Sequence, residues 1–168
     1  HAFAWAREHG RTRVTMADKA NAIAAHALWR RVFDEVGSEY ADITRDTRYI
    51  DAMAMDLVRT PEAFQVIVTG NLFGDIISDL ASILVGGLGL APSANRHPGR
   101  VAMYEPVHGS APPLAATDVA NPMAAILSLA MMLDGVGEAD AALAVERAVR
   151  AAIDATVGTS DVGGTLGT

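Results

Sequence analysis

The sequence predicts an α/β fold, in which strands alternate with helices. Residues 64–69 form a nearly continuous apolar run, which is typical of a strand buried on both faces. A helical pattern follows this run directly. Residues 12–16 show β-branched alternation, and a second helical pattern over residues 21–36 follows after a short polar connection. Strand, short turn and helix in this order form the arrangement in which ligands gather at the carboxyl ends of strands.

The composition limits the classes of function. The chain has 168 residues, enough to bury a core as one domain or as two small lobes. Its net charge of −7 argues against nucleic acid and against an anionic membrane as partners. The most apolar stretch, residues 123–133, is too short to span a bilayer. Because the chain has no cysteine, it is compatible with a reducing compartment, and we expect a cytoplasmic protein.

The first half of the chain is predicted to alternate between helices and strands. The expected elements are a helix over residues 2–9, a strand over 12–16, a helix over 21–36, an edge strand over 42–49, a short helix over 51–58 and a strand over 64–69. On the helix over residues 21–36, we expect an apolar face lined by Leu28, Val32 and Val36 and widened by Trp29 and Phe33.

The second half is predicted to be richer in loops. Residues 86–89 contain three glycines but follow a helix rather than a strand, so they do not form a dinucleotide-binding fingerprint. We then expect a loop over residues 92–99, a short strand over 101–104, a helix beginning at Asn121 and Pro122 that is apolar on all sides, and an amphipathic helix over 140–157.

Two carboxylates on one helix face are the first candidate site. Asp75 and Asp79 are four residues apart, and no Lys or Arg occurs between residues 60 and 95. Like charges at this spacing cost about 0.2–0.5 kcal/mol when solvated. A hard divalent cation such as Mg²⁺ or Mn²⁺ would offset that cost and leave positions open for a substrate. The alternative is a solvated acidic face on a surface helix.

The second candidate is the lysine at position 19. Of the thirteen basic residues, Lys19 is the one lysine and the other twelve are arginines. An amine can lose its proton near neutral pH when it is desolvated, whereas a guanidinium cannot, so a lysine can serve as a base. An ordinary surface lysine is the alternative.

A loop of small and rigid residues is the third candidate. Over residues 105–112 (EPVHGSAP), backbone N–H groups and the Ser110 hydroxyl can bond to phosphate or ribose oxygens, and His108 can stack on a base. A tight structural turn would explain the same residues.

Taken together, these segments resemble one family. The carriers are residues 15–21 (TMADKAN), 49–52 (YIDA), 71–79 (NLFGDIISD) and 105–112. In order and spacing they are similar to the metal-dependent β-decarboxylating dehydrogenases, which include isopropylmalate, isocitrate, homoisocitrate and tartrate/D-malate dehydrogenases. The resemblance covers essentially the whole chain and implies the isopropylmalate-dehydrogenase-like α/β fold.

The resemblance implies a reaction and the groups that carry it. A 2-hydroxy acid with a carboxylate on C3 is oxidised by hydride transfer to NAD(P)⁺, and the resulting β-keto acid loses CO₂. Asp75 and Asp79 are implied as ligands of Mg²⁺ or Mn²⁺, with Asp51 contributed by the other subunit of a homodimer. Lys19, also lent across the dimer, is implied as the general base at the C2 hydroxyl.

The same resemblance implies a cofactor site. Asn21 is expected near the nicotinamide. The residues expected to hold the adenosine half are Glu105, His108, Gly109, Ser110, Ala111, Pro112, Leu114 and Asn121. Pro113 has neither a carboxylate for the ribose hydroxyls nor a cation for a 2′-phosphate, so we expect NAD, with NADP left open.

Family subunits are about twice as long as this chain, so we expect the C-terminal half of a two-domain subunit, inactive when isolated. Residues 1–85 match part of the smaller, dimer-forming domain, and residues 86–168 match part of the larger, nucleotide-binding domain. The arginines that grip the substrate and the tyrosine that protonates the enol belong to the other half.

Substrate choice rests on short segments. Residues 159–163 resemble isopropylmalate dehydrogenases, whereas residues 91–95 with Pro98 are closer to the tartrate/D-malate branch, and residues 49–55 to homoisocitrate enzymes. We expect 3-isopropylmalate, hence a role in leucine biosynthesis. A noncatalytic regulatory subunit of the family is the remaining alternative, although such a subunit has little need to keep Lys19 and three aspartates.

Overall fold

The computed structural model describes residues 1–97, 99 and 101–168. The resemblance noted at Pro98 therefore lies outside the described residues. The chain divides into two compact units, residues 1–81 and residues 82–168, each of which is described by itself. The expected domain assignment, with its boundary after residue 85, stays a prediction.

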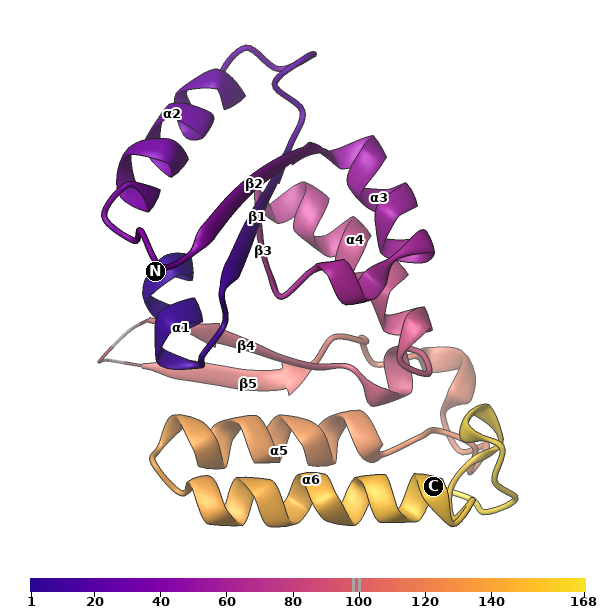
Figure 1. Cartoon of the computed structure of the whole chain (residues 1–168). Helices are drawn as coiled ribbons and strands as arrows, with labels where there is room; N and C mark the ends of the chain where they lie inside the picture. Colours follow the sequence, from indigo (N-terminus) through magenta and orange to yellow (C-terminus); the bar gives the residue numbers. More distant parts are fainter. Residues whose placement is uncertain (98, 100) are drawn as a thin grey trace. The chain divides into compact units, whose positions relative to one another are not determined.

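The N-terminal unit is built on a three-stranded parallel sheet with the order β2-β1-β3 (Figure 1). The strands are β1 (Arg13–Asp18), β2 (Thr44–Tyr49) and β3 (Val66–Thr69). β1 is the central strand, and five of its six residues are buried. β2 lies at the edge, as the sequence predicted, whereas β3 is only partly buried, because within these three strands it lies at the other edge.

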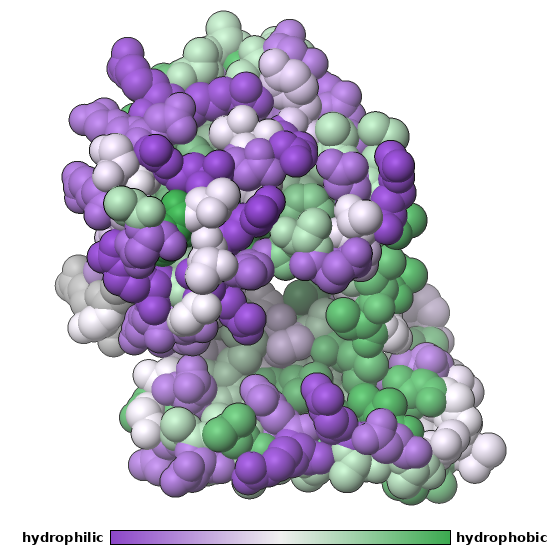
Figure 2. Space-filling model, viewed as in Figure 1, coloured by the Kyte–Doolittle hydropathy of each residue, from purple (hydrophilic) through white to green (hydrophobic). Residues whose placement is uncertain are grey.

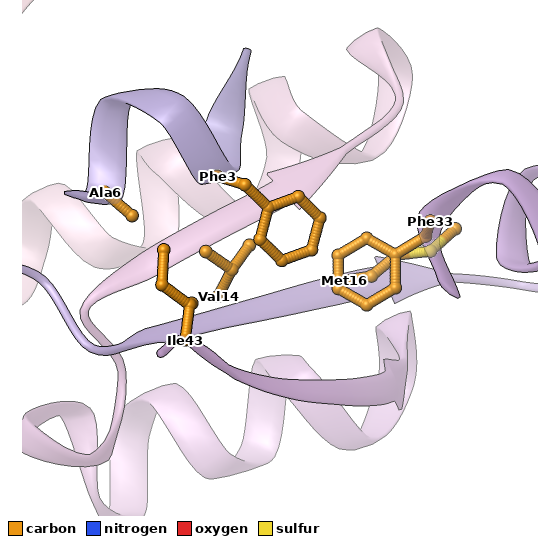
Figure 3. Close-up of a cluster of buried hydrophobic side chains, with 6 residues drawn as sticks. All are labelled: Phe3, Ala6, Val14, Met16, Phe33 and Ile43. Carbon is orange, nitrogen blue, oxygen red and sulfur yellow. The ribbon is translucent and has the colours of Figure 1, made fainter. Parts of the chain in front are cut away.

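Four helices pack on this sheet: α1 (Ala2–Glu8), α2 (His26–Gly37), α3 (Ile50–Arg59) and α4 (Asn71–Leu84). Alternate residues of β1 point to opposite faces. Val14 and Met16 join the cluster of Figure 3, with Phe3 and Ala6 of α1, Phe33 of α2 and Ile43. Ala17 joins a second cluster, with Met53 and Leu57 of α3 and Ile77 of α4. The helices therefore cover both faces of the sheet.

The start of α2 and the extent of its buried face differ from the prediction. The helix begins at His26, and turns occupy the residues between Lys19 and that point. Leu28 is 55% exposed, whereas Phe33 is buried, so the helix packs through only part of the predicted face. Gly37, the last residue of α2, packs closely against the Phe3 ring, because a Cβ at this position would lie 2.8 Å from it. The aromatic rings and this close approach decide which face is buried.

The C-terminal unit contains a two-stranded antiparallel sheet and two helices. The elements are β4 (Pro92–Arg96), β5 (Ala102–Pro106), α5 (Met123–Gly135) and α6 (Ala139–Asp154). The loop expected over residues 92–99 was therefore wrong for its first five residues, which pair with β5. A strand that begins at proline loses no ladder bond there, so Pro92 is compatible with this position.

Short 3₁₀ turns connect these elements, namely η1 (Pro61–Ala63), η2 (Leu88–Leu90), η3 (Pro112–Leu114) and η4 (Ser160–Val162). Large apolar side chains also reach the surface of both units, as the green areas of Figure 2 show. They include Leu72, Ile76, Val101, Val136 and Leu143. Among the described residues, no helix combines the length and the apolar character needed to cross a bilayer.

Met53 offers a test of the core on the α3 side of the sheet. Its side chain is fully buried, so Met53→Ala should lower the free energy of unfolding by about 2–5 kcal/mol. Met55 of the same helix is 61% exposed, and Met55→Ala should change stability by no more than about 0.5 kcal/mol. The midpoints of urea unfolding measure both values, and equal losses in the two variants would contradict this packing.

Candidate active site

The lysine singled out by the sequence lies at the carboxyl end of the central strand. Lys19 directly follows β1, and Asp51 lies in the first turn of α3, directly after β2. Because the two strands are parallel, with Asp18 opposite Tyr49, both strands finish at the same end of the sheet, its carboxyl end. The Lys19 Nζ lies 2.9 Å from Asp51 Oδ1. The structure thus joins two of the predicted site residues in one ion pair.

This ion pair sets the charge state of the aspartate. The hydrogen bond from Lys19 lowers the pKa of the Asp51 carboxyl below its ordinary value, and the backbone N–H of Asp51 adds to the effect. Asp51 is therefore held as a carboxylate, the form that binds a metal ion. The Lys19 side chain is 26% exposed and that of Asp51 63%, so the pair is open to solvent on the aspartate side.

A second ion pair, whose carboxylate is buried, involves Asp18, the residue before Lys19. Asp18 is fully buried, and its carboxylate accepts hydrogen bonds from Arg30 Nε at 2.5 Å and Nη2 at 3.1 Å. Asp18 Oδ1 also accepts the backbone N–H of Ala20 at 2.7 Å. The Arg30 guanidinium stacks over the Tyr49 ring at 4.6 Å. These contacts tie the end of β1 to α2 and to the end of β2.

Sequence reasoning missed Asp18 and Arg30. A charged residue directly after the uncharged residues 14–17 of a buried strand was the available signal, because a buried carboxylate requires a partner. The partner lies on the next helix, and nothing in the local pattern points to it.

The two acidic residues of α4 lie one turn apart on an exposed face of the helix. Both Asp75 and Asp79 are exposed, and Asn71 Nδ2 donates to Asp75 Oδ2 at 3.3 Å. Only Gly70 separates α4 from β3, which is parallel to β1, so the start of α4 lies at the same carboxyl end of the sheet as Lys19. Within the part of the chain that the structure describes, no three acidic, histidine or cysteine side chains are grouped closely enough to hold a metal ion. Asp51, Asp75 and Asp79 therefore do not form a complete site in a single chain.

The C-terminal unit contains a pocket of about 520 Å³ at the predicted cofactor loop. Six of the predicted residues line it, namely His108, Gly109, Ser110, Ala111, Leu114 and Asn121. Glu105 of β5 and Pro112 of η3 are not among the residues that line it. Asn21 belongs to the N-terminal unit, where it is exposed in the turns that follow Lys19.

Strained backbone shapes this loop. Ala111, Ala116 and Asp118 adopt the left-handed conformation, with φ values of 44°, 58° and 54°. This conformation costs about 1–2 kcal/mol for each residue that has a side chain, and such strain concentrates at functional sites.

Asp161 organises the wall of the pocket and was also missed. Its carboxylate accepts hydrogen bonds from Asn121 Nδ2 at 2.9 Å and from the Thr159 hydroxyl at 2.5 Å. Burial opposes its charge, but the bonds from Thr159 and Asn121 outweigh burial and lower the pKa of Asp161 below its ordinary value. A Cβ on Gly89 would lie 2.9 Å from Asp161 Oδ2, so a glycine is required beside this carboxylate.

The amide of Asn121 is held at both ends. Its Oδ1 accepts the backbone N–H of Met123 at 2.9 Å, at the start of α5, while its Nδ2 donates to Asp161. The orientation of the amide is therefore fixed in the pocket wall, which Asn121 lines.

Comparison with known proteins finds relatives that match nearly the whole chain. A family model described as isocitrate/isopropylmalate dehydrogenase matches residues 1–168. The chain is 54% identical to a 3-isopropylmalate dehydrogenase of Salinibacter ruber over 149 residues, which are 89% of this chain and 40% of that protein. It is 50% identical to a 3-isopropylmalate dehydrogenase of Shouchella clausii, covering 96% of this chain and 44% of that protein.

A solved structure agrees with the fold. The crystal structure of isocitrate dehydrogenase from Methylococcus capsulatus superposes with a TM-score of 0.96 at 46% identity, covering 99% of this chain and 50% of that one. The chain thus spans about half the length of the relatives it matches.

The ion pair between Lys19 and Asp51 has a measurable signature. Lys19→Met should raise the pKa of Asp51 toward its ordinary value of about 3.9, which a ¹³C NMR titration of the carboxyl measures. Because the pair lowers this pKa, its contribution to stability should be present at neutral pH and disappear as the pH falls through the pKa of the folded state.

Arg59→Met, which removes a cation from the last turn of α3, is the control and should leave the Asp51 titration unchanged. An unaltered Asp51 pKa in Lys19→Met would contradict the ion pair.

Proposed function

The chain belongs to the isocitrate/isopropylmalate dehydrogenase family, and from this premise we propose that the complete protein oxidises and decarboxylates 3-isopropylmalate with NAD⁺. The observation that carries the proposal is about 50% identity to two 3-isopropylmalate dehydrogenases over nine-tenths of this chain. The pairing of Lys19 with Asp51 at the carboxyl end of a parallel sheet adds physical support.

The metal site is proposed to form between two subunits. Asp75 and Asp79 of one subunit and Asp51 of the partner subunit would hold Mg²⁺ or Mn²⁺, and their hard carboxylate oxygens suit either ion. Bound there, the cation would polarise the C2 oxygen of the substrate. The distribution of the described residues supports this division, because one chain alone does not group three such ligands.

Lys19 is proposed as the general base. Its amine would accept the proton of the C2 hydroxyl as hydride leaves C2 for the nicotinamide, which turns the alcohol into a ketone. The C3 carboxylate is then β to a carbonyl and departs as CO₂, and the enol that remains takes up a proton at C3. The 2.9 Å contact with Asp51 would bring base and metal ligand to the substrate from the same subunit.

The pocket at residues 108–121 is proposed to bind the adenosine half of the cofactor, and Asn21 to lie near the nicotinamide. A volume of about 520 Å³ and a mixed apolar and polar lining fit a nucleoside. None of the described residues that line the pocket is a Lys or Arg, so a 2′-phosphate would find no cation there. This lining favours NAD over NADP, in agreement with Pro113.

A homodimer follows from the same proposal. Leu72 and Ile76 of α4 are 70% and 57% exposed, and they lie in the same turns as Asp75. A second copy placed against α4 would bury these apolar side chains and bring its own Lys19 and Asp51 to the acidic pair. We place this dimer in the cytoplasm, acting on a small 2-hydroxy dicarboxylate.

Isocitrate is the second candidate substrate, because the Methylococcus capsulatus isocitrate dehydrogenase matches this chain with a TM-score of 0.96. Tartrate, D-malate and homoisocitrate remain further alternatives, as does a noncatalytic subunit.

Assays of the full-length protein with Mn²⁺ test these options. We expect the highest kcat/KM with 3-isopropylmalate and NAD⁺, lower values with isocitrate, D-malate, tartrate and homoisocitrate, and no turnover once the metal is chelated. A higher kcat/KM with any other substrate would reject the substrate assignment. Absence of turnover with all five would favour a noncatalytic subunit.

A further inference from the structure

The backbone N–H of Lys19 is held by a side chain rather than by the sheet. β1 pairs with β2 as far as Asp18 and with β3 as far as Ala17. Lys19 lies past these last paired positions, and its N–H donates to Nδ1 of His26 at 3.0 Å. This bond reaches from the end of β1 to the first residue of α2.

The carbonyl of the same residue is also held. The backbone N–H groups of Ala22 and Ile23 donate to the Lys19 carbonyl at 2.9 Å and 2.7 Å. The peptide groups before and after the Lys19 Cα therefore both have hydrogen-bond partners. Arg30 in addition fixes the side chain of the preceding residue, Asp18. The direction in which the Lys19 side chain leaves the backbone is therefore set by this turn.

The His26 ring is itself fixed by two aromatic neighbours. Its centroid lies 5.9 Å from that of Trp29 and 6.0 Å from that of Phe73, with both rings edge-on to it. Phe73 belongs to the first turn of α4, the helix that carries Asp75. Since Nδ1 accepts a hydrogen bond, it carries no proton, and the proton of the neutral ring lies on Nε2.

We propose that His26 is a positioning residue for Lys19, acting through the hydrogen bond from the Lys19 N–H to its Nδ1. This inference rests on the proposed function of Lys19 as the base. A base must lie within hydrogen-bond reach of the proton it removes, and a displacement of about 1 Å can cost about a hundredfold in rate. The aromatic contacts of His26 fix the ring, and the ring fixes the peptide that bears the amine.

Two substitutions in the full-length enzyme separate the hydrogen bond from the packing. His26→Leu keeps an apolar side chain against Trp29 and Phe73 but removes the acceptor. His26→Asn places Oδ1 near the position of Nδ1 and restores it. We expect His26→Leu to lower the single-turnover rate of NADH formation by about ten- to a hundredfold with KM for the substrate within about twofold. His26→Asn should remain within about threefold of the wild type.

Hydrogen exchange provides a readout that does not depend on catalysis. The Lys19 amide should exchange faster in His26→Leu and at the wild-type rate in His26→Asn. His9→Leu is the matched control, because His9 also stacks on a tryptophan of this unit, Trp5, with a centroid distance of 4.0 Å. It should change neither the rate nor the exchange of Lys19.

Each outcome decides the proposal. Wild-type turnover and wild-type Lys19 exchange in His26→Leu would overturn it. Equal losses in His26→Leu and His26→Asn would also overturn it, because packing rather than the hydrogen bond would then be responsible. If the wild-type enzyme lacks dehydrogenase activity, the proposed function fails, while faster exchange of the Lys19 amide in His26→Leu alone would still show the bond.

Discussion

Parallel pairing of β1 with both of its neighbours is the constraint on which the candidate site depends. It brings the carboxyl ends of three strands to the same end of the N-terminal sheet. Lys19, the first turn of α3 and the start of α4 follow them there. If one neighbour were antiparallel, the segment that follows it would lie at the opposite end of the sheet. The ion pair between Lys19 and Asp51 is a direct consequence of this pairing.

The buried charge of Asp18 then fixes the geometry at the carboxyl end of the sheet. The carboxylate of Asp18 is fully buried, and the loss of Arg30 would remove its ion-pair partner, which a buried charge requires. The C-terminal unit uses a similar device, since Asp161 holds the Asn121 amide in the pocket wall. In both units an aspartate with no proposed catalytic role fixes the structure beside a predicted site residue: Asp18 precedes Lys19, and Asp161 bonds to Asn121.

The order of elements in the N-terminal unit could be predicted because it depends on local periodicity and on chain punctuation. The resemblance of short motifs also assigned Lys19 and Asp51 to one site, and the structure pairs them, while their roles stay predictions. The family and the isopropylmalate-dehydrogenase-like α/β fold are confirmed by the match over residues 1–168 and by the superposition.

The remainder depends on contacts between distant residues. Local hydrophobicity predicted Leu28 as a core residue of α2, but the rings of Phe3 and Phe33 decide which face packs. β4 forms because it pairs with β5, whereas its own sequence, PSANR, has no strand pattern that would predict it. His26 belongs to no recognisable motif, and its hydrogen bond to Lys19 depends on how the turn between them folds.

The division of the site between two subunits is the central claim, and complementation tests it most directly. Full-length Lys19→Ala and Asp75→Asn subunits are each expected to form inactive homodimers. In a mixed dimer, one site combines both substitutions, and the other combines the intact Lys19 of one subunit with the intact Asp75 of the other. Random mixing of equal amounts should therefore restore about a quarter of wild-type activity. No recovery, with mixed dimers demonstrated by mass spectrometry, would contradict the shared site.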